Sequence, residues 1–351
     1  MDFKRRKTRK IKVGNTFLGG DSSIKIQSML NLPAEDIRGS VAQAEALERA
    51  GCEIIRTAVP DMKSVALIEA LKNAVGIPVV ADIHFDYRLA LAAVDAGADK
   101  IRINPGNIGD DGRIKAVADK CRGAGVPIRI GVNSGSVEKE LLKKYGGPTP
   151  EALAMSAIKN AKLLEKFDFN DIVISIKSSD VRNTYAANIE VAKMCDYPLH
   201  LGVTEAGTEL SSAIKSSAAL GGLLLSGIGD TVRISITGDP VREVVCAKEL
   251  LKSLGLKKGG VTFVSCPTCG RTKIDLVSLA NAVEQKLCGC DKNVKVAVMG
   301  CVVNGPGEAK EADIGVAGGD GCGVIFRKGE IIKKVPEDRL LPELLSEIDK
   351  L

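Results

Sequence analysis

The sequence has no tryptophan, and aromatic residues make up only 3% of its 351 residues. Proteins that bind single-stranded nucleic acids stack bases on aromatic side chains, so this scarcity argues against such a function. The chain has only two histidines, too few for several histidine-based metal sites. It shows no secretory signal and no apolar run of membrane-spanning length. We therefore expect a cytoplasmic protein with reduced thiols, and neither a membrane nor a nucleic acid as its partner.

Positive charge is concentrated at the N-terminus. Residues 1–12 hold seven lysines and arginines against Asp2 alone, whereas the whole chain carries a net charge of only +5. The rest of the chain is therefore close to neutral. We interpret this segment as a solvated basic arm, with contact to nucleic acid or membrane as the alternative.

Between residues 24 and 255, short β-branched segments alternate with longer segments of helical spacing, which predicts parallel βα units. Eight such units close into a (β/α)8 TIM barrel, and a doubly wound open sheet is the alternative. Neither a G-x-G-x-x-G motif nor a P-loop follows the first strand, which disfavours nucleotide-binding versions. The expected strands cover residues 24–28, 53–58, 78–82, 99–103, 127–131, 171–177, 198–203 and 232–236.

A glycine- and lysine-rich segment at 255–261 is typical of a linker, and most of the ten cysteines follow it. We expect two domains, a barrel over residues 1–257 and a small α/β domain over 258–351. In the second domain the sequence predicts strands at 261–264, 294–299, 313–317 and 323–326, and helices at 274–287 and 337–349.

Cationic side chains recur near the ends of the expected barrel strands. Both faces of a parallel strand wrapped by helices are normally apolar, so a charged side chain there needs a partner. Active sites of barrels lie at the carboxyl ends of the strands, where converging cations suit a phosphate or diphosphate. The five cations are Arg56, Arg102, Arg129, Lys177 and Arg233. Further polar side chains near these ends are Asp82, His84, Asn104, Asn133, His200, Glu205 and Ser235. The pattern predicts a small phosphorylated substrate.

The cysteines of the second domain suggest a metal centre. Cys266 and Cys269 form a C-x-x-C pair, which fits a redox disulfide, a zinc half-site or an iron–sulfur half-site. Cys301 opens a loop rich in glycine and proline, which adds a third thiolate, and Glu308 in that loop is a candidate fourth ligand. A zinc site would instead use Cys266, Cys269, Cys288 and Cys290. We interpret the other thiols as buried small hydrophobes: Cys52, Cys121, Cys195, Cys246 and Cys322.

On these residues alone, other functions stay open. One is a non-redox lyase or isomerase acting on a phosphorylated sugar, with a zinc ribbon as its tail. Another is an RNA-binding protein that uses the basic arm and a zinc knuckle. The first function leaves Cys301 and its loop without a role, and the second needs more aromatic side chains than the 3% that the chain contains.

Over nearly its whole length the chain resembles a known family, the bacterial 4-hydroxy-3-methylbut-2-en-1-yl diphosphate synthases. The motifs that carry the resemblance are VGNTFLGG, IQSM, RTAVPD, VADIHFD, KIRINPGN, IRIGVNSGS, SIKSSD, LHLGVTEAG, GIGDTVRISIT, CPTCGRT and MGCVVNGPGEA. The resemblance implies a TIM barrel followed by an iron–sulfur domain. It implies a reductive ring opening of 2-C-methyl-D-erythritol 2,4-cyclodiphosphate, in which two electrons enter and water leaves, with flavodoxin or ferredoxin as the donor.

The resemblance also implies roles for individual residues. Cys266, Cys269 and Cys301 would hold a [4Fe–4S] cluster, with Glu308 on the fourth iron. Glu205 is a candidate proton handler. The residues that match substrate-binding positions are Arg56, Asp82, Arg102, Asn104, Arg129, Asn133, Lys177, Arg233, Ser235 and Asn304. The family further implies a homodimer in which the barrel of one subunit faces the cluster domain of the other.

Two positions depart from the family pattern. Leu30 to Pro33 read LNLP after the IQSM motif, where threonine and aspartate are usual around the asparagine, so a substrate contact from this loop is not expected. Thr237 replaces a common serine and keeps the hydroxyl group, so we expect little effect there.

Overall fold

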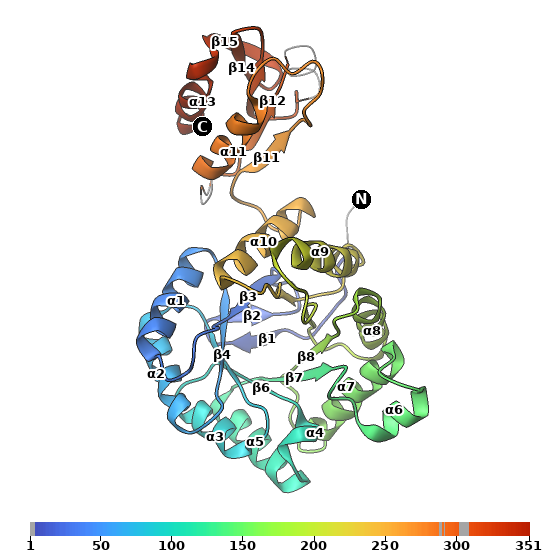
Figure 1. Ribbon diagram of the computed structural model, residues 1–351. Helices are drawn as coiled ribbons and strands as arrows, with labels where there is room; N and C mark the ends of the chain where they lie inside the picture. Colours follow the sequence, from blue (N-terminus) through green and yellow to red (C-terminus); the bar gives the residue numbers. More distant parts are fainter. Residues whose placement is uncertain (1–3, 288–289, 291, 302–308) are drawn as a thin grey trace. The chain divides into compact units, whose positions relative to one another are not determined.

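A computed structural model describes residues 4–287, 290, 292–301 and 309–351 of the chain. The chain divides into two compact units, Met1–Lys257 and Lys258–Leu351 (Figure 1). None of the helices in the described ranges is both long and apolar enough to cross a membrane.

The first unit is built around eight parallel strands. They are β3 (Lys25–Met29), β4 (Ile54–Ala58), β5 (Val79–Asp82), β6 (Lys100–Ile103), β7 (Ile128–Asn133), β8 (Ile172–Lys177), β9 (His200–Leu201) and β10 (Thr231–Val232). Neighbours in sequence are neighbours in the sheet, and β10 pairs with both β3 and β9. A parallel bridge between Ile174 and Leu199 links β8 to the segment before β9 and closes the ring. The predicted TIM barrel is therefore confirmed, and the open-sheet alternative is wrong.

Helices cover the outside of the barrel (Figure 1). Several begin at an aspartate or threonine whose side chain accepts a hydrogen bond from the first turn, as Asp36, Thr149 and Asp180 do. The helices are α1 (Ile37–Arg49), α2 (Ala66–Ala74), α3 (Tyr87–Asp95), α4 (Pro105–Ile108), α5 (Asp111–Ala124), α6 (Lys139–Tyr145), α7 (Pro150–Glu165), α8 (Val181–Met194), α9 (Glu209–Leu225) and α10 (Pro240–Ser253), with a 3₁₀ turn at Lys63–Val65.

A short hairpin closes one end of the barrel. Its antiparallel strands, β1 (Ile11–Val13) and β2 (Thr16–Leu18), precede the first barrel strand. Ile11, Val13 and Leu18 are buried and pack as one apolar cluster with side chains of the barrel strands β4, β5 and β8. We call this cluster the apolar plug; its barrel members are Ile54, Val80 and Val173.

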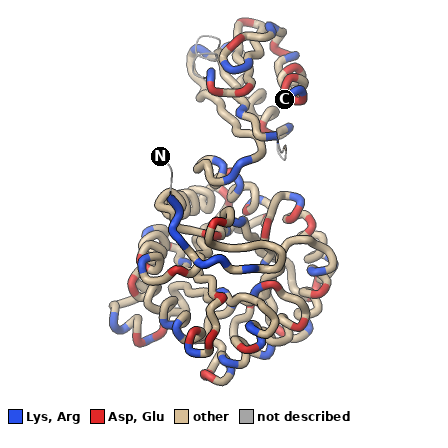
Figure 2. Tube along the Cα trace, turned by 180° about the vertical axis from the view of Figure 1, so that it is seen from behind, with Lys and Arg blue, Asp and Glu red and all other residues tan. Residues whose placement is uncertain are grey.

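The basic N-terminal segment is not a solvated arm, so that expectation is wrong for its described part. Arg5 is half-buried, and its guanidinium donates to Asp230 Oδ1 at 2.7 Å. Arg6 is likewise half-buried and donates to the main-chain oxygen of Ala192 at 3.2 Å, while Arg9 donates to Asp196 at 2.8 Å. Figure 2 shows this segment, rich in lysine and arginine, running along the barrel. These charges therefore fasten the segment to the barrel.

The second unit contains a mixed five-stranded sheet of β11 (Thr262–Ser265), β12 (Lys295–Met299), β13 (Ile314–Gly318), β14 (Cys322–Arg327) and β15 (Glu330–Pro336). Strands β11, β12 and β13 are parallel, and β14 and β15 are antiparallel to their neighbours. Helices α11 (Leu276–Leu287) and α13 (Leu340–Asp349) pack on the sheet, with a 3₁₀ turn at Glu337–Arg339. Strand β15 was not predicted, because it is an edge strand whose side chains are almost all exposed.

Candidate active site

The register of the barrel strands turns a row of charged residues inward. Arg102 on β6 pairs with Asp82 on β5 and with Arg129 on β7, and partners side by side in a sheet point to the same face. Two glycines make room for the long side chains. A Cβ atom on Gly131 would lie 2.3 Å from Arg102 Nε, and one on Gly202 would lie 2.7 Å from Lys177 Nζ. Glycine at these two positions therefore leaves space in the barrel for long basic side chains.

Asp82 holds two of the arginines. Its buried carboxylate accepts from Arg56 Nη2 at 2.9 Å and from Arg102 Nη1 at 3.0 Å. His84 Nε2 lies 3.3 Å from the same carboxylate. Burial alone would raise the pKa of Asp82, but the Arg56 charge, the His84 hydrogen bond and the Arg102 charge hold this pKa well below its usual range. Asp82 is therefore an anion that positions two guanidinium groups.

Arg129 and Lys177 are cations with few partners. Arg129 is 1% exposed, and its guanidinium donates only one weak hydrogen bond within the described residues, to Gln27 Oε1 at 3.3 Å. Lys177 Nζ is buried and has no acceptor among those residues. Burial lowers the pKa of both groups well below the usual range, and the neighbouring arginine charges lower it further. An anion that enters the barrel would stabilise these buried groups by pairing with them.

Arg233 is positioned by an acid that the sequence analysis missed. Arg233 and Ser235 were expected on a strand over 232–236. Strand β10 ends at Val232, so both residues follow the strand instead. Glu243 on α10 is buried and accepts from Arg233 Nη2 at 3.1 Å and Nε at 3.3 Å. The same carboxylate accepts from Ser28 Oγ at 2.8 Å and from the main-chain nitrogen of Ile236 at 3.1 Å.

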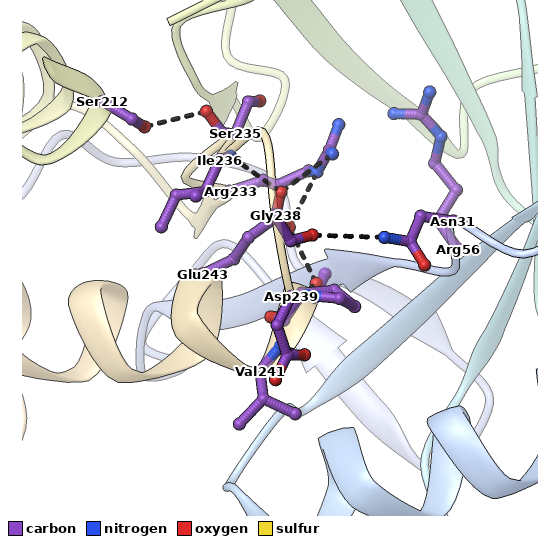
Figure 3. A network of polar contacts seen from close by, with 12 residues as sticks. Asn31, Arg56, Ser212, Arg233, Ser235, Ile236, Gly238, Asp239, Val241 and Glu243 are labelled. Carbon is purple, nitrogen blue, oxygen red and sulfur yellow. Dashed lines mark hydrogen bonds and ion pairs between the residues drawn. The ribbon is translucent and has the colours of Figure 1, made fainter. Parts of the chain in front are cut away.

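Figure 3 shows how this network ties the segment after β10 to its surroundings. Ser212 on α9 donates to the main-chain oxygen of Ser235 at 2.8 Å. Asn31, from the loop after β3, donates to the main-chain oxygen of Gly238 at 3.2 Å. In this view Arg56 lies near the labelled network. The loop that departs from the family pattern therefore has a structural contact of its own.

A small pocket opens beside Arg102. It contains the amide side chains of Asn104, which caps α4, and of Asn133, which ends β7. The Oδ1 atoms of both are engaged by main-chain amides, whereas Nδ2 of Asn104 is buried without a partner in the described part of the chain. The lining residues are Ile83, His84, Arg102, Asn104, Asn107, Gly131, Asn133 and Ser136.

Not every expected site residue lies in this group. His200 was expected at the opening of the barrel, but it is fully buried inside, with Nδ1 2.7 Å from Thr231 Oγ1. Burial and the charge of Lys177 lower the pKa of His200 well below its usual value. Glu205 is exposed, in a left-handed backbone conformation with φ of 53°. Lys100, a sixth inward basic side chain, is not predicted by the sequence, because a lysine at the start of a strand is normally solvated.

The thiols of the second unit gather at one edge of its sheet. Cys266 follows β11 and Cys301 follows β12, two neighbouring parallel strands whose carboxyl ends share this edge. Cys266 Sγ accepts a hydrogen bond from the main-chain nitrogen of Gly300 at 3.2 Å. Cys269 is exposed, and hydrogen bonds from the main chain and side chain of Arg271 lower the pKa of its thiol.

The remaining cysteines were expected to be buried, and only some of them are. Cys52 and Cys121 are buried as expected, but Cys195, Cys246 and Cys322 are only half-buried. Cys322 begins β14 at the same edge as Cys266 and Cys301, since Gly318 at the end of β13 pairs with Gly323. Three proposed residues, Cys288, Asn304 and Glu308, lie outside the described residues. Within those described, no three His, Cys, Asp or Glu side chains form a preassembled metal-binding group.

Comparison with known proteins covers both units. A family model described as the GcpE TIM-barrel domain matches residues 8–248, and one described as the GcpE protein C-terminal domain matches residues 262–350. The chain belongs to the GcpE family. The two GcpE matches include the barrel strands that carry the cations and the sheet edge that carries the thiols.

Relatives of this GcpE-family chain are similar over almost their full length. A protein from Clostridium perfringens is 56% identical over 347 residues, 99% of each chain. One from Caldanaerobacter subterraneus is 57% identical over 347 residues, 99% of this chain and 98% of its own. Both carry the name 4-hydroxy-3-methylbut-2-en-1-yl diphosphate synthase (flavodoxin).

Two solved structures resemble about seven tenths of this chain in fold. Dihydropteroate synthase from Stenotrophomonas maltophilia matches with a TM-score of 0.53 at 15% identity, covering 71% of this chain and 98% of its own. A type I 3-dehydroquinate dehydratase from Clostridium difficile matches with a TM-score of 0.52 at 15% identity, covering 71% of this chain and 97% of its own. At this identity the likeness supports the fold of the GcpE barrel and no common activity.

Proposed function

We propose that this chain opens the ring of 2-C-methyl-D-erythritol 2,4-cyclodiphosphate reductively. The products are (E)-4-hydroxy-3-methylbut-2-enyl diphosphate and water, and two electrons enter the reaction together with the protons that form the water. The surplus of cations inside the barrel carries the proposal. Among the described residues, six inward basic side chains face two buried carboxylates, and a doubly phosphorylated substrate supplies the missing negative charge. The names of the close relatives support the same reaction.

The barrel binds and orients the diphosphate. Arginine side chains bind phosphate oxygens in pairs and lysine adds a point charge, so the substrate contacts are Arg56, Arg102, Arg129, Lys177 and Arg233. The short polar side chains beside them, Asn104, Asn133 and Ser235, donate hydrogen bonds. Asn304, which lies outside the described residues, is the remaining proposed substrate contact. Asp82 and Glu243 position the guanidinium groups, so little ordering remains for the moment of binding.

The thiol edge of the second sheet fits an iron–sulfur cluster. Cys266, Cys269 and Cys301 are the proposed ligands, with Glu308 as the ligand that is not a thiol. The main-chain amide that donates to Cys266 Sγ and the lowered pKa of the Cys269 thiol suit thiolate ligation. A [4Fe–4S] cluster bound there would supply the electrons for the reduction. Glu205, exposed beyond β9, is the proposed proton handler.

The proposal extends to partners and compartment. Flavodoxin, which appears in the names of both relatives, is the proposed electron donor, and ferredoxin is the alternative. Nine described cysteines are unpaired, and Cys269 is exposed, so we place the protein in the reducing cytoplasm. The active form is a homodimer in which the barrel of one subunit meets the cluster domain of the other.

Anaerobic turnover tests the function. Protein purified without oxygen is supplied with the cyclodiphosphate, dithionite and a viologen, and the linear diphosphate is measured. We expect a brown protein with near-stoichiometric sulfide and a broad band around 400 nm, as thiolate-bound clusters give. A colourless zinc protein without turnover would overturn the proposal and favour the non-redox alternative.

A further inference from the structure

Lys100 is a fully buried lysine whose ammonium nitrogen has no acceptor within the described residues. It begins β6, two residues before Arg102, so its side chain points into the barrel one layer deeper. Its register partner on β5 is Val80, a member of the apolar plug. Lys100 therefore lies between an apolar floor and the cations that face the proposed substrate.

The charges around Lys100 are almost all positive. Arg56 and Arg129 act on it from β4 and β7, and Lys100 acts in turn on buried His200 of β9. The acid next in sequence, Asp99, is engaged elsewhere: it accepts from Lys72 Nζ at 2.7 Å and from the main-chain nitrogen of Val79 at 2.8 Å. Asp82 of β5 is held by Arg56 and Arg102. No described carboxylate pairs with Lys100.

A buried ammonium without an anion is unfavourable, and an amine can avoid the penalty by losing its proton. Burial, followed by the charges of Arg129 and Arg56, lowers the pKa of Lys100 well below the usual range. A diphosphate bound among the arginines would bring negative charge above Lys100 and reverse the sign of this effect. Ligand binding and protonation of this amine are then linked.

We propose that Lys100 is a neutral amine in the unliganded protein and takes up one proton from solvent when a diphosphate binds, becoming the deepest cation of the site. The inference rests on the proposed function, which supplies the class of ligand. It makes Lys100 a positioning residue for the anion. It also makes the affinity for the substrate depend on pH in a way that permanently charged arginines alone would not.

Isothermal titration calorimetry tests this directly. The cyclodiphosphate is titrated into the holoenzyme slightly above neutral pH, in two buffers of different ionisation enthalpy, so that the difference in heat counts the protons taken up. In wild type we expect a net uptake. In Lys100→Met the uptake falls by about one proton and the affinity falls about tenfold, the factor that corresponds to one lost charge interaction of modest strength. The variant also unfolds at a higher temperature, because a desolvated amine has been removed.

Matched variants identify the acceptor of the proton. Lys115→Met makes the same change on an exposed helix and should leave uptake, affinity and stability unchanged. Lys177→Met and His200→Gln remove two other buried groups whose pKa burial lowers. The proposal fails if wild type takes up no proton, or if the uptake survives in Lys100→Met and disappears in one of these two. Lys100→Gln, which keeps a polar side chain, repeats the measurement should the methionine variant not fold.

A second ligand separates this inference from the proposed function. Inorganic pyrophosphate carries the diphosphate group without the sugar, and the same titrations are repeated with it. Binding of pyrophosphate with proton uptake that depends on Lys100, but no binding of the cyclodiphosphate, would overturn the proposed substrate and keep the role of Lys100. Binding of both ligands without Lys100-dependent uptake would do the reverse.

Discussion

The barrel interior and the thiol edge of the second sheet differ in how much of each site exists before a ligand binds. Inside the barrel, Asp82 and Glu243 are buried and already hold three arginine side chains in place. At the sheet edge, Cys269 is exposed, and the thiol of Cys266 accepts a single main-chain hydrogen bond. The barrel site is held in place by its own buried ion pairs, whereas the thiol edge would need the proposed cluster to bring its ligands together.

This difference separates two tasks. Preorganised charges bind an anion at a low cost in side-chain entropy, so we expect the affinity for the proposed diphosphate substrate to reside in the barrel. Where thiolates come together only when a metal binds, the folding of the surrounding chain depends on that metal. A substitution in the barrel should therefore weaken substrate binding without loss of the cluster, and a substitution at the thiol edge should do the opposite.

The largest effect is expected from Cys301→Ser. The proposed cluster loses a ligand, so reductive turnover should fall below detection, roughly a thousandfold or more for a reaction that depends on its cofactor. The barrel does not contain this residue, so calorimetric affinity for the cyclodiphosphate should stay within about twofold of wild type, well below one tenfold step. Cys246→Ser, a half-buried thiol on α10, is the matched control and should retain turnover. Turnover in Cys301→Ser with a chemical reductant would disprove the ligand assignment.

Removal of the proposed cluster should destabilise the second unit and leave the stability of the barrel unchanged. Ligands that bind the folded state stabilise it, so iron chelation should lower the unfolding temperature of the second unit and leave that of the barrel unchanged. Limited proteolysis of the holo and apo forms, with fragments identified by mass spectrometry, would localise the change. Cleavage appearing first in the barrel would contradict the comparison.

Glu243→Gln damages the barrel site without touching the thiols. A neutral amide cannot balance Arg233, and breaking a buried ion pair costs about 3 kcal/mol. We expect that loss in urea unfolding of the barrel, together with about tenfold weaker binding of the cyclodiphosphate, one step of 1.4 kcal/mol. Glu209→Gln breaks an exposed pair with Arg242 and should change neither quantity measurably. Equal effects of the two substitutions would show that Glu243 is an ordinary surface partner.

The sequence predicted the barrel because its strands alternate with helices, and it predicted five cations in the barrel because each lies near the end of an expected strand. It did not predict Lys100 or Glu243 as part of the site. An acid on a helix is normally solvated, and only the packing of α10 against β3 and the segment after β10 buries Glu243 beneath Arg233. The hairpin of β1 and β2 was missed because three-residue strands carry little periodicity.

The smallest expected effect is a change in how the stability of the barrel depends on pH when Asp82 is replaced. Its pKa lies well below the usual value in the folded protein, so the unfolded chain binds more protons in acid. The carboxylate therefore contributes stability that is complete above its unfolded pKa of about 4 and is lost as the pH falls toward the folded value. In Asp82→Asn this contribution is absent at neutral pH, so the barrel should be less stable there and its stability should decline less steeply in acid. Urea unfolding from pH 7 to pH 3, with Asp21→Asn as the exposed control, measures both slopes. Added pyrophosphate should restore part of the lost stability, because an anion again faces Arg56 and Arg102. Parallel pH curves for wild type and Asp82→Asn would mean that the two guanidinium groups do not depend on this carboxylate.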